Sequence, residues 1–387
     1  MRKLFLLVSA VVLVDTAFFA AIAPLLPKYA ADLDLSKSAA GLLTASYAAG
    51  TLVGSLPAGW LAVRFGVKPT LLTGLVLLAI TSLAFGFANH VVLLDSARFV
   101  QGIGGACSWA AGMAWLVGAA PPGRRGELLG AGLSAAIVGV LLGPVLGGAA
   151  TVVTPEVVFS GVAAVAIGLA AVAWTMPAVA PGEETSVLAA VTALRRPAVA
   201  AAFGLFMLPA LFSGVLDVLA PLRLSHLGAS GVAVGAIFLV AAAFEAVVSP
   251  VSGRLSDQRG RLAPMRIGLA GAAILGVLLP LPSQVLLSAA LLVLVVMALG
   301  TFWAPAMAML SDASDAVGLD QGLAFALANL AWAGGHVIGG AGGARLADAT
   351  SDAVPYGLMA GICALTLAAV LTRRTPRAAV GSSPGSQ

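Results

Sequence analysis

The segment Gly59-Trp-Leu-Ala-Val63-Arg64-Phe-Gly66-Val-Lys68 lies between two long apolar stretches, and a similar segment, Gly253-Arg-Leu-Ser-Asp257-Gln-Arg259-Gly260-Arg261, follows about half the chain later. Both segments place basic residues around a second glycine. Glycine tolerates the positive φ angle of a tight turn, and the first glycine lets a helix end approach its neighbour closely. Basic residues between apolar spans favour one membrane surface. The repeated segment therefore predicts two copies of a helix pair that crosses a membrane.

The composition of the whole chain supports a membrane protein. Of its 387 residues, 60% are hydrophobic and 9% are charged, and the mean hydropathy is +1.06. Soluble domains carry about a quarter charged residues, so this chain has too few charges to cover a water-facing surface. The net charge of +4 does not indicate nucleic-acid binding, because the basic residues lie at the ends of apolar stretches.

Apolar stretches of about twenty residues are long enough to cross the hydrocarbon core as helices. The expected fold class is an all-α polytopic membrane protein with twelve transmembrane helices in two pseudo-symmetric six-helix halves. The expected units are a first half at 1–176, a cytoplasmic linker at 177–197, a second half at 198–372 and a disordered cytoplasmic tail at 373–387. The expected spans are 4–26, 38–62, 69–88, 92–118, 127–151, 156–176, 198–222, 231–252, 264–281, 284–310, 320–343 and 353–371.

Lysine and arginine residues lie mostly on one side of this arrangement. With both termini on the cytoplasmic side, only Lys28, Lys37, Arg223 and Arg345 fall on the outer side. Basic residues concentrate on the cytoplasmic side of membrane proteins. The sequence therefore predicts a multi-pass protein of the cell inner (cytoplasmic) membrane with both termini in the cytoplasm. The first apolar run resembles a signal peptide, but it continues to Leu26 and is expected to remain as a span.

A second pair of matching segments supports the internal repeat. Trp109 and Met113 match Trp303 and Met307 at an offset of 194 residues (303 minus 109), which is also the offset of the two turn segments (253 minus 59). Aromatic and methionine side chains suit a pliable pocket for amphipathic ligands, although packing in the core is the alternative for each of them. The candidates for lining a substrate cavity are Tyr47, Trp109, Met113, Trp303, Met307 and Trp332.

The two turn segments resemble the signature Gly-x-Leu-Ala-Asp-(Arg/Lys)-x-Gly-Arg-(Arg/Lys) of the major facilitator superfamily. The second copy matches well, whereas the first has Val63 in place of the acid and Val67 in place of a base. The resemblance implies that the acid belongs to a charge network holding the inner gate closed, a role that Asp257 then carries alone. A basic turn that only sets topology is the alternative. The gating candidates are Gly59, Arg64, Gly66, Lys68, Gly253, Asp257, Gly260 and Arg261.

Span 4 carries the string Arg98-Phe-Val-Gln101-Gly102, which resembles the Arg-x-x-Gln-Gly pattern of this family. An arginine at the centre of a span costs roughly 2.5 kcal/mol or more, so it should face protein or a water-filled cavity. The resemblance implies a proton-relay or structural role for Arg98. Asp95 lies on the same helical face and is expected to pair with Arg98. An arginine that only anchors the outer interface is the alternative.

Span 5 contains a regular series of glycines around one proline. Glycines at four-residue spacing form a flat groove into which another helix packs closely, and the proline bends the helix. The spacing resembles the antiporter motif of the superfamily, which implies export of a substrate in exchange for protons. A generic glycine-rich packing helix is the alternative. The motif residues are Gly130, Gly139, Gly143, Pro144, Gly147 and Gly148.

Ionisable residues within the apolar spans are the remaining functional candidates. Asp15 lies in the middle of span 1, where it resembles the acid of the drug:proton antiporter and vesicular amine transporter branch. Removal from water favours the neutral carboxyl group, so such an acid can bind and release a proton near neutral pH. Glu245 in span 8, Asp217 in span 7 and His336 in span 11 are further candidates for proton or substrate binding, with helix contacts as their alternative.

The expected function is proton-coupled antiport that exports amphipathic small molecules or drugs by alternating access. The alternatives are a carrier of a small polar metabolite, such as a sugar or amino-acid derivative, and a non-transporting membrane sensor or enzyme. The expected partners are a small-molecule substrate, protons and the lipid bilayer, and the protein is expected to be monomeric, without enzymatic activity. The sequence contains no phosphate-binding loop and no spacing of metal ligands, so we expect no cofactor and no metal.

Overall fold

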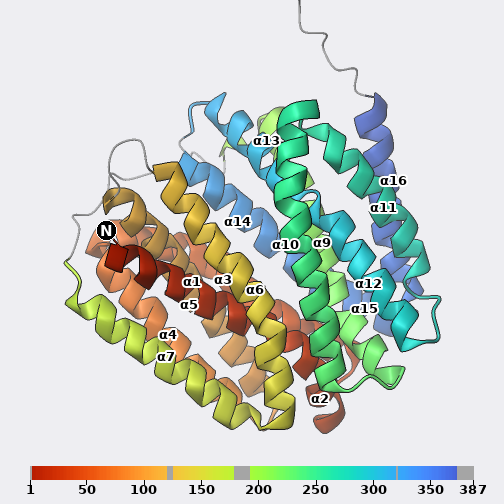
Figure 1. Ribbon diagram of the computed structural model, residues 1–387, viewed down its shortest axis with the longest axis horizontal. Coiled ribbons are helices and arrows are strands. Elements are labelled where there is room, and N and C mark those ends of the chain that lie inside the picture. The colour runs from red at the N-terminus through yellow and green to blue at the C-terminus, as the bar shows by residue number, and fades with distance from the viewer. Residues whose placement is uncertain (1, 120–124, 178–191, 320, 373–387) are drawn as a thin grey trace, which may run out of the picture.

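The computed structural model describes residues 2–119, 125–177, 192–319 and 321–372, and the side chains of residues 117, 125–133 and 321–323 are outside this description. Most of the predicted linker and the whole predicted tail lie outside it as well. The described chain is helical throughout, without strands (Figure 1). The helices are α1 (Arg2–Ala20), α2 (Ile22–Asp32), α3 (Lys37–Phe65), α4 (Val67–Gly86), α5 (Val91–Ala119), α6 (Arg125–Val152), α7 (Pro155–Thr175), α9 (Pro197–His226), α10 (Gly231–Arg259), α11 (Leu262–Leu278), α12 (Val285–Gly300), α13 (Trp303–Asp315), α14 (Gln321–Val337), the π-helix η1 (Ile338–Gly342), α15 (Gly343–Ala349) and α16 (Ala353–Thr372).

These elements confirm the predicted all-α fold with twelve crossings. Among the described residues, nine helices are long and apolar enough to cross a membrane. Three crossings are interrupted: α1 and α2 form one crossing, α12 and α13 form another, and α14, η1 and α15 form a third. Pro24 and Pro305 lie a few residues after two of these breaks. Proline cannot donate the hydrogen bond that would continue the preceding turn, which accounts for the two breaks. The sequence analysis did not predict these breaks.

The twelve crossings form two groups that lie side by side. In Figure 1, helices α1 to α7 (red to yellow) occupy one side of the bundle, and α9 to α16 (green to blue) occupy the other. Within the first group α3 packs on α5 and α1 packs on α6; within the second, α9 packs on α14 and α11 on α16. We refer to residues 2–177 as the first half and to residues 192–372 as the second half.

Two glycines allow the closest helix contact of the first half. A Cβ atom at Gly50 would lie 1.9 Å from the carbonyl oxygen of Phe99, and a Cβ atom at Gly102 would lie 2.0 Å from that of Tyr47. Helices α3 and α5 therefore meet backbone to backbone, as small residues permit within lipid. This contact places Tyr47 on α3 directly beside α5, which matters for the site described below.

Two contact regions join the halves. Helix α10 packs along α6, and α3 packs along the interrupted crossing of α14, η1 and α15. We call the end of the bundle that carries the α2–α3 and α15–α16 turns the Lys37 end, and the end that carries the α3–α4 and α10–α11 turns the Arg64 end. The positive φ angles expected at the second glycines of the repeated turns are present at the Arg64 end, +96° at Gly66 and +88° at Gly260.

Candidate functional site

Asp15 lies on α1 and is surrounded by side chains of α3 and α5. Its side chain is 1% exposed. One carboxylate oxygen, Oδ2, accepts hydrogen bonds from the Tyr47 hydroxyl at 2.8 Å and from the Trp109 indole Nε1 at 3.3 Å. The other oxygen, Oδ1, is buried and has no hydrogen-bond partner. The structure thus brings together three candidates predicted from separate spans.

Glu245 on α10 has a matching arrangement in the second half. Its Oε1 atom accepts a hydrogen bond of 2.6 Å from the Trp303 indole Nε1 on α13. Trp303 is the repeat equivalent of Trp109, so the two equivalent tryptophans each donate to a carboxylate. The two acids are not equivalent, because Asp15 lies on the first crossing of its half and Glu245 on the second. The repeat in the sequence therefore could not reveal this pairing.

A third polar group joins α9 and α14. The His336 Nε2 atom lies 3.7 Å from Oδ2 of Asp217, and its Nδ1 atom lies 3.0 Å from the carbonyl oxygen of Trp332. The His336 ring also stacks on the Trp332 ring, with centroids 4.4 Å apart. Asp217 is close enough to interact electrostatically with Glu245 on α10. The two acids and the histidine of the second half therefore belong to one region.

Arg98 is completely buried and holds the break between α1 and α2. Its guanidinium donates hydrogen bonds to the carbonyl oxygens of Phe18 at 3.3 Å and Phe19 at 3.1 Å, and to Oε1 of Gln101 at 2.9 Å. The expected pair with Asp95 does not form; the guanidinium instead bonds two carbonyl oxygens of α1 and Gln101 on its own helix. Oδ1 of Asp95 is buried without a partner. The buried position of Arg98 also differs from the alternative of an arginine that extends to the membrane interface.

Aromatic rings line the boundary between the two halves. The Phe19 ring lies 4.8 Å from the Tyr47 ring in the first half and 5.3 Å from the Trp332 ring in the second, measured between centroids. Phe19 was not among the predicted residues, although its position one turn after Asp15 is a signal that could have identified it. Met113 and Met307 are partly buried and pack against hydrophobic clusters, as Trp109 does.

The glycine motif of α6 packs in two directions. Cβ atoms at Gly139, Gly143 and Gly147 would lie 2.6, 2.3 and 2.1 Å from the nearest atoms of α1 and of the α1–α2 break. The opposite side faces α10 in the second half, where a Cβ atom at Gly235 would lie 2.8 Å from the Pro144 carbonyl oxygen and Cα of Val232 lies close to Gly148. Gly130 lies on the part of α6 whose packing is outside the described residues. The motif thus holds α6 between the crossing that carries Asp15 and the second half.

The two basic turns at the Arg64 end have different surroundings. Arg261 pairs with Asp257 at 2.7 Å and with Asp312 at 3.4 Å, all within the second half. Lys68 instead donates to the carbonyl oxygens of Trp174 at 2.6 Å and Met176 at 2.7 Å, which closes the last turn of α7.

The first glycine of each turn does not provide the close helix approach expected from the sequence. A Cβ atom at Gly59 would meet no atom within 4 Å, and one at Gly253 would make only an ordinary 3.4 Å contact with Ala304. Arg64 is exposed. The helix ends at these turns are therefore spaced widely enough to accept a side chain at either position.

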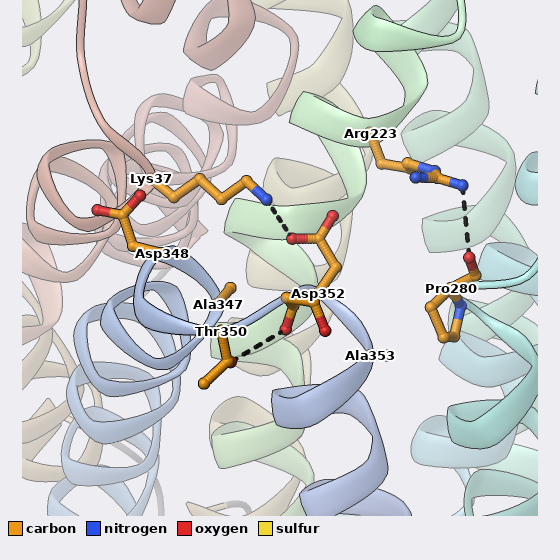
Figure 2. Close-up of a pocket in the computed structure, with 9 residues that line it drawn as sticks. Lys37, Arg223, Pro280, Ala347, Asp348, Thr350, Asp352 and Ala353 are labelled. Atoms are coloured by element: carbon orange, nitrogen blue, oxygen red, sulfur yellow. Dashed lines mark hydrogen bonds and ion pairs between the residues drawn. The ribbon is translucent and has the colours of Figure 1, made fainter.

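Polar side chains connect the two halves at the Lys37 end. Lys37 on α3 forms an ion pair of 2.5 Å with Asp352, and both the hydroxyl and the amide nitrogen of Ser38 donate to Asp348, at 2.6 and 3.3 Å. These contacts border a cavity of about 480 Å³ that Arg223 also lines (Figure 2). The hydroxyl and amide of Ser38 hold the pKa of Asp348 below its ordinary value. The Lys37 end is therefore closed by contacts between the halves.

The comparisons with known proteins identify the family. The family model of the Major Facilitator Superfamily matches residues 7–319 and 224–387, and the chain belongs to this family of membrane transporters. A solved structure of a D-xylose-proton symporter superposes with a TM-score of 0.75 at 20% identity, over 95% of this chain and 97% of that one, which confirms the fold.

Curated relatives match a short stretch of the chain. The MFS-type transporter ppzB of Metarhizium rileyi is 35% identical over 89 residues, 23% of this chain and 18% of the relative. The synaptic vesicular amine transporter of Bos taurus is 35% identical over 88 residues, 22% of this chain and 17% of the relative. The matched stretch thus spans about a fifth of the length of each relative. Among the described residues, no group of three or more His, Cys, Asp or Glu side chains is placed to hold a metal ion.

Proposed function

We propose that this protein is a proton-coupled antiporter that exports amphipathic, positively charged small molecules. The observation that carries the proposal is the pair of intramembrane carboxylates, Asp15 and Glu245, each bonded to one of the two equivalent tryptophans. An ionisable group within a membrane span is costly and marks a pathway for ions or substrate. The aromatic rings between the halves offer flat faces that attract organic cations.

The proposed cycle exchanges one cation for protons across the two halves. Substrate enters from the Arg64 end and binds between the halves beside the aromatic rings, and a carboxylate releases a proton. The contacts at the Lys37 end then separate, substrate leaves there, and protons from that side return to the carboxylates. When one monovalent cation is exchanged for one proton, no net charge moves, so the proton concentration difference drives the exchange, and each tenfold difference supplies about 1.4 kcal/mol.

The orientation is part of the proposal. We place the Arg64 end and both chain termini in the cytoplasm and the Lys37 end outside, because basic residues concentrate on the cytoplasmic side. We further propose two transport halves at 1–176 and 198–372, joined by a cytoplasmic linker, in a monomer of the inner membrane. The glycine motif of α6 supports export, and the short match to a protein named vesicular amine transporter supports a cationic cargo.

Transport in reconstituted vesicles tests this function. Proteoliposomes with an acidic interior, in which the protein is inserted with its Arg64 end outward, are loaded with a pH-sensitive dye, and ethidium is added outside. We expect ethidium to be taken up and the interior to become less acidic, whereas xylose should do neither. Replacing Asp15 with Asn or Glu245 with Gln should abolish proton-coupled uptake at normal expression. Uptake of ethidium that is indifferent to pH, or proton movement with xylose alone, would refute the proposal.

A further inference from the structure

We propose that the two acids have separate tasks: Asp15 carries the proton, and Glu245 binds the charge of the organic cation. This inference rests on the proposed function and assigns its two exchanged ions to different halves of the protein. It follows from how differently the two carboxylates are enclosed.

The Asp15 carboxylate has space for a proton but not for a substrate group. The Tyr47 hydroxyl and the Trp109 indole both donate to Oδ2, and Oδ1 is buried without a partner. The wall beside both oxygens is Gly105, where even a single Cβ atom would lie 3.0 and 3.1 Å from them. An organic cation cannot reach either oxygen without moving a helix. Oδ1 is therefore the atom at which a proton binds and leaves.

The groups around Asp15 allow its carboxylate to gain and lose a proton without rearrangement. The groups that act on it are Tyr47 from α3 and Trp109 and Arg98 from α5. Helices α6 and α7 also pack against α1, and among the described residues they place no charged side chain against Asp15. The two neutral donors remain in place when Asp15 is ionised, and Oδ1 accepts the proton without displacing them.

The Glu245 carboxylate is less enclosed. Its residue is only partly buried, and the Trp303 indole donates to one of its oxygens, Oε1. The Trp303 ring meets the Phe206 ring edge to face at 5.4 Å, which provides an aromatic surface beside the charge. Asp217, with 28% of its side chain exposed, lies within electrostatic range of Glu245 and adds a second acid to the region. A less enclosed carboxylate, a second acid and aromatic faces together recognise a cation with an aromatic body.

Arg98 connects the two tasks. Its guanidinium carbon lies 5.2 Å from the centre of the Tyr47 ring, whose hydroxyl donates to Asp15, and 5.8 Å from the centre of the Phe19 ring. The Phe19 ring in turn meets the ring of His336, whose Nε2 atom lies 3.7 Å from Asp217. When a cation arrives beside Glu245 and Asp217, one proton leaves Oδ1 of Asp15, and the total charge of the region is unchanged. The exchange therefore needs no direct contact between the cation and Asp15.

Equilibrium binding of tetraphenylphosphonium, a permanent cation with four aromatic rings, tests the inference on the purified full-length protein. We expect wild-type protein to bind it more tightly as the pH rises and to release protons on binding. Asp15→Asn should bind within about threefold of wild type at alkaline pH, with no pH dependence and no proton release. Glu245→Gln should bind at least about tenfold more weakly, a loss of about 1.4 kcal/mol, and Glu245→Asp should recover part of the affinity.

The outcomes separate this inference from the proposed function. Loss of binding in Asp15→Asn with normal binding in Glu245→Gln would overturn the division of tasks alone, because the wild-type protein would still exchange cation for proton. If wild-type protein binds no tetraphenylphosphonium at any pH, the proposed function fails as well. Should Asp15→Asn not fold, Tyr47→Phe is the second variant: it removes one donor to Asp15 but keeps the aromatic ring, and it should change the pH dependence of binding. An unchanged pH dependence would overturn the role of Asp15.

Discussion

A single methyl group on α6 should disturb the packing of the crossing that carries Asp15. In Gly147→Ala the new Cβ atom would lie 2.1 Å from the Ala21 carbonyl oxygen and 2.6 Å from Cγ of Pro24. The first distance is 1.3 Å shorter than an ordinary 3.4 Å contact (3.4 minus 2.1). The obstacle is backbone rather than the end of a flexible side chain, so α6 must move away or the α1–α2 break must deform. Overpacking of this kind costs about 1–3 kcal/mol.

Gly161→Ala is the matched control. Gly161 lies on the exposed face of α7, and a Cβ atom there would meet nothing within 4 Å. Both variants gain the same preference of alanine over glycine for the helix, about 0.5–1 kcal/mol, so the difference between them isolates the clash. Thermal unfolding of the purified proteins in detergent, followed by circular dichroism, should give Gly147→Ala the lower midpoint. Equal midpoints for the two variants would refute the tight contact between α6 and the α1–α2 break.

Three further predictions concern the Lys37 end and Arg98. Lys37→Ala removes a partly exposed ion pair worth about 0.2–1 kcal/mol. Ala45 on α3 is buried beside Gly340 of the second half, so a cysteine at this position, in a background without native cysteines, should react with maleimide up to about fivefold faster in the Lys37→Ala variant; an unchanged rate would contradict a closing role. Because the pKa of Asp348 is lowered, its contact with Ser38 should persist as the pH falls through the ordinary carboxyl range and be lost only below it. If the cysteine at position 45 became more accessible to labelling already within the ordinary carboxyl range, that result would be evidence against the contact. Arg98→Lys replaces the two guanidinium nitrogens that reach the α1 carbonyls and Gln101 with a single nitrogen, so it should unfold at a lower temperature than wild type and transport less; full activity would show that the fork-shaped contact is dispensable.

The pairing of acids with tryptophans marks where sequence reasoning reached its limit. The repeat offset correctly matched Trp109 with Trp303, but it could not associate them with Asp15 and Glu245, which occupy non-equivalent crossings. The partner of Arg98 was also assigned wrongly, since spacing along one helix favoured Asp95. At the break after Ala20 the carbonyl oxygens of Phe18 and Phe19 accept from the guanidinium, and the spacing of residues along α5 could not indicate a break on another helix.

Composition, apolar run length and the internal repeat sufficed to determine that this chain crosses a membrane twelve times as helices, because a backbone in hydrocarbon must satisfy its own hydrogen bonds. The sequence also determined which positions are glycine or proline, and so which helix faces permit close approach. Only the tertiary structure decided that Asp15 is enclosed while Glu245 is less so, and that Lys37 meets Asp352. Those facts depend on contacts between side chains on different helices, separated by 32 residues for Asp15 and Tyr47 and by 315 for Lys37 and Asp352, and no local pattern records them.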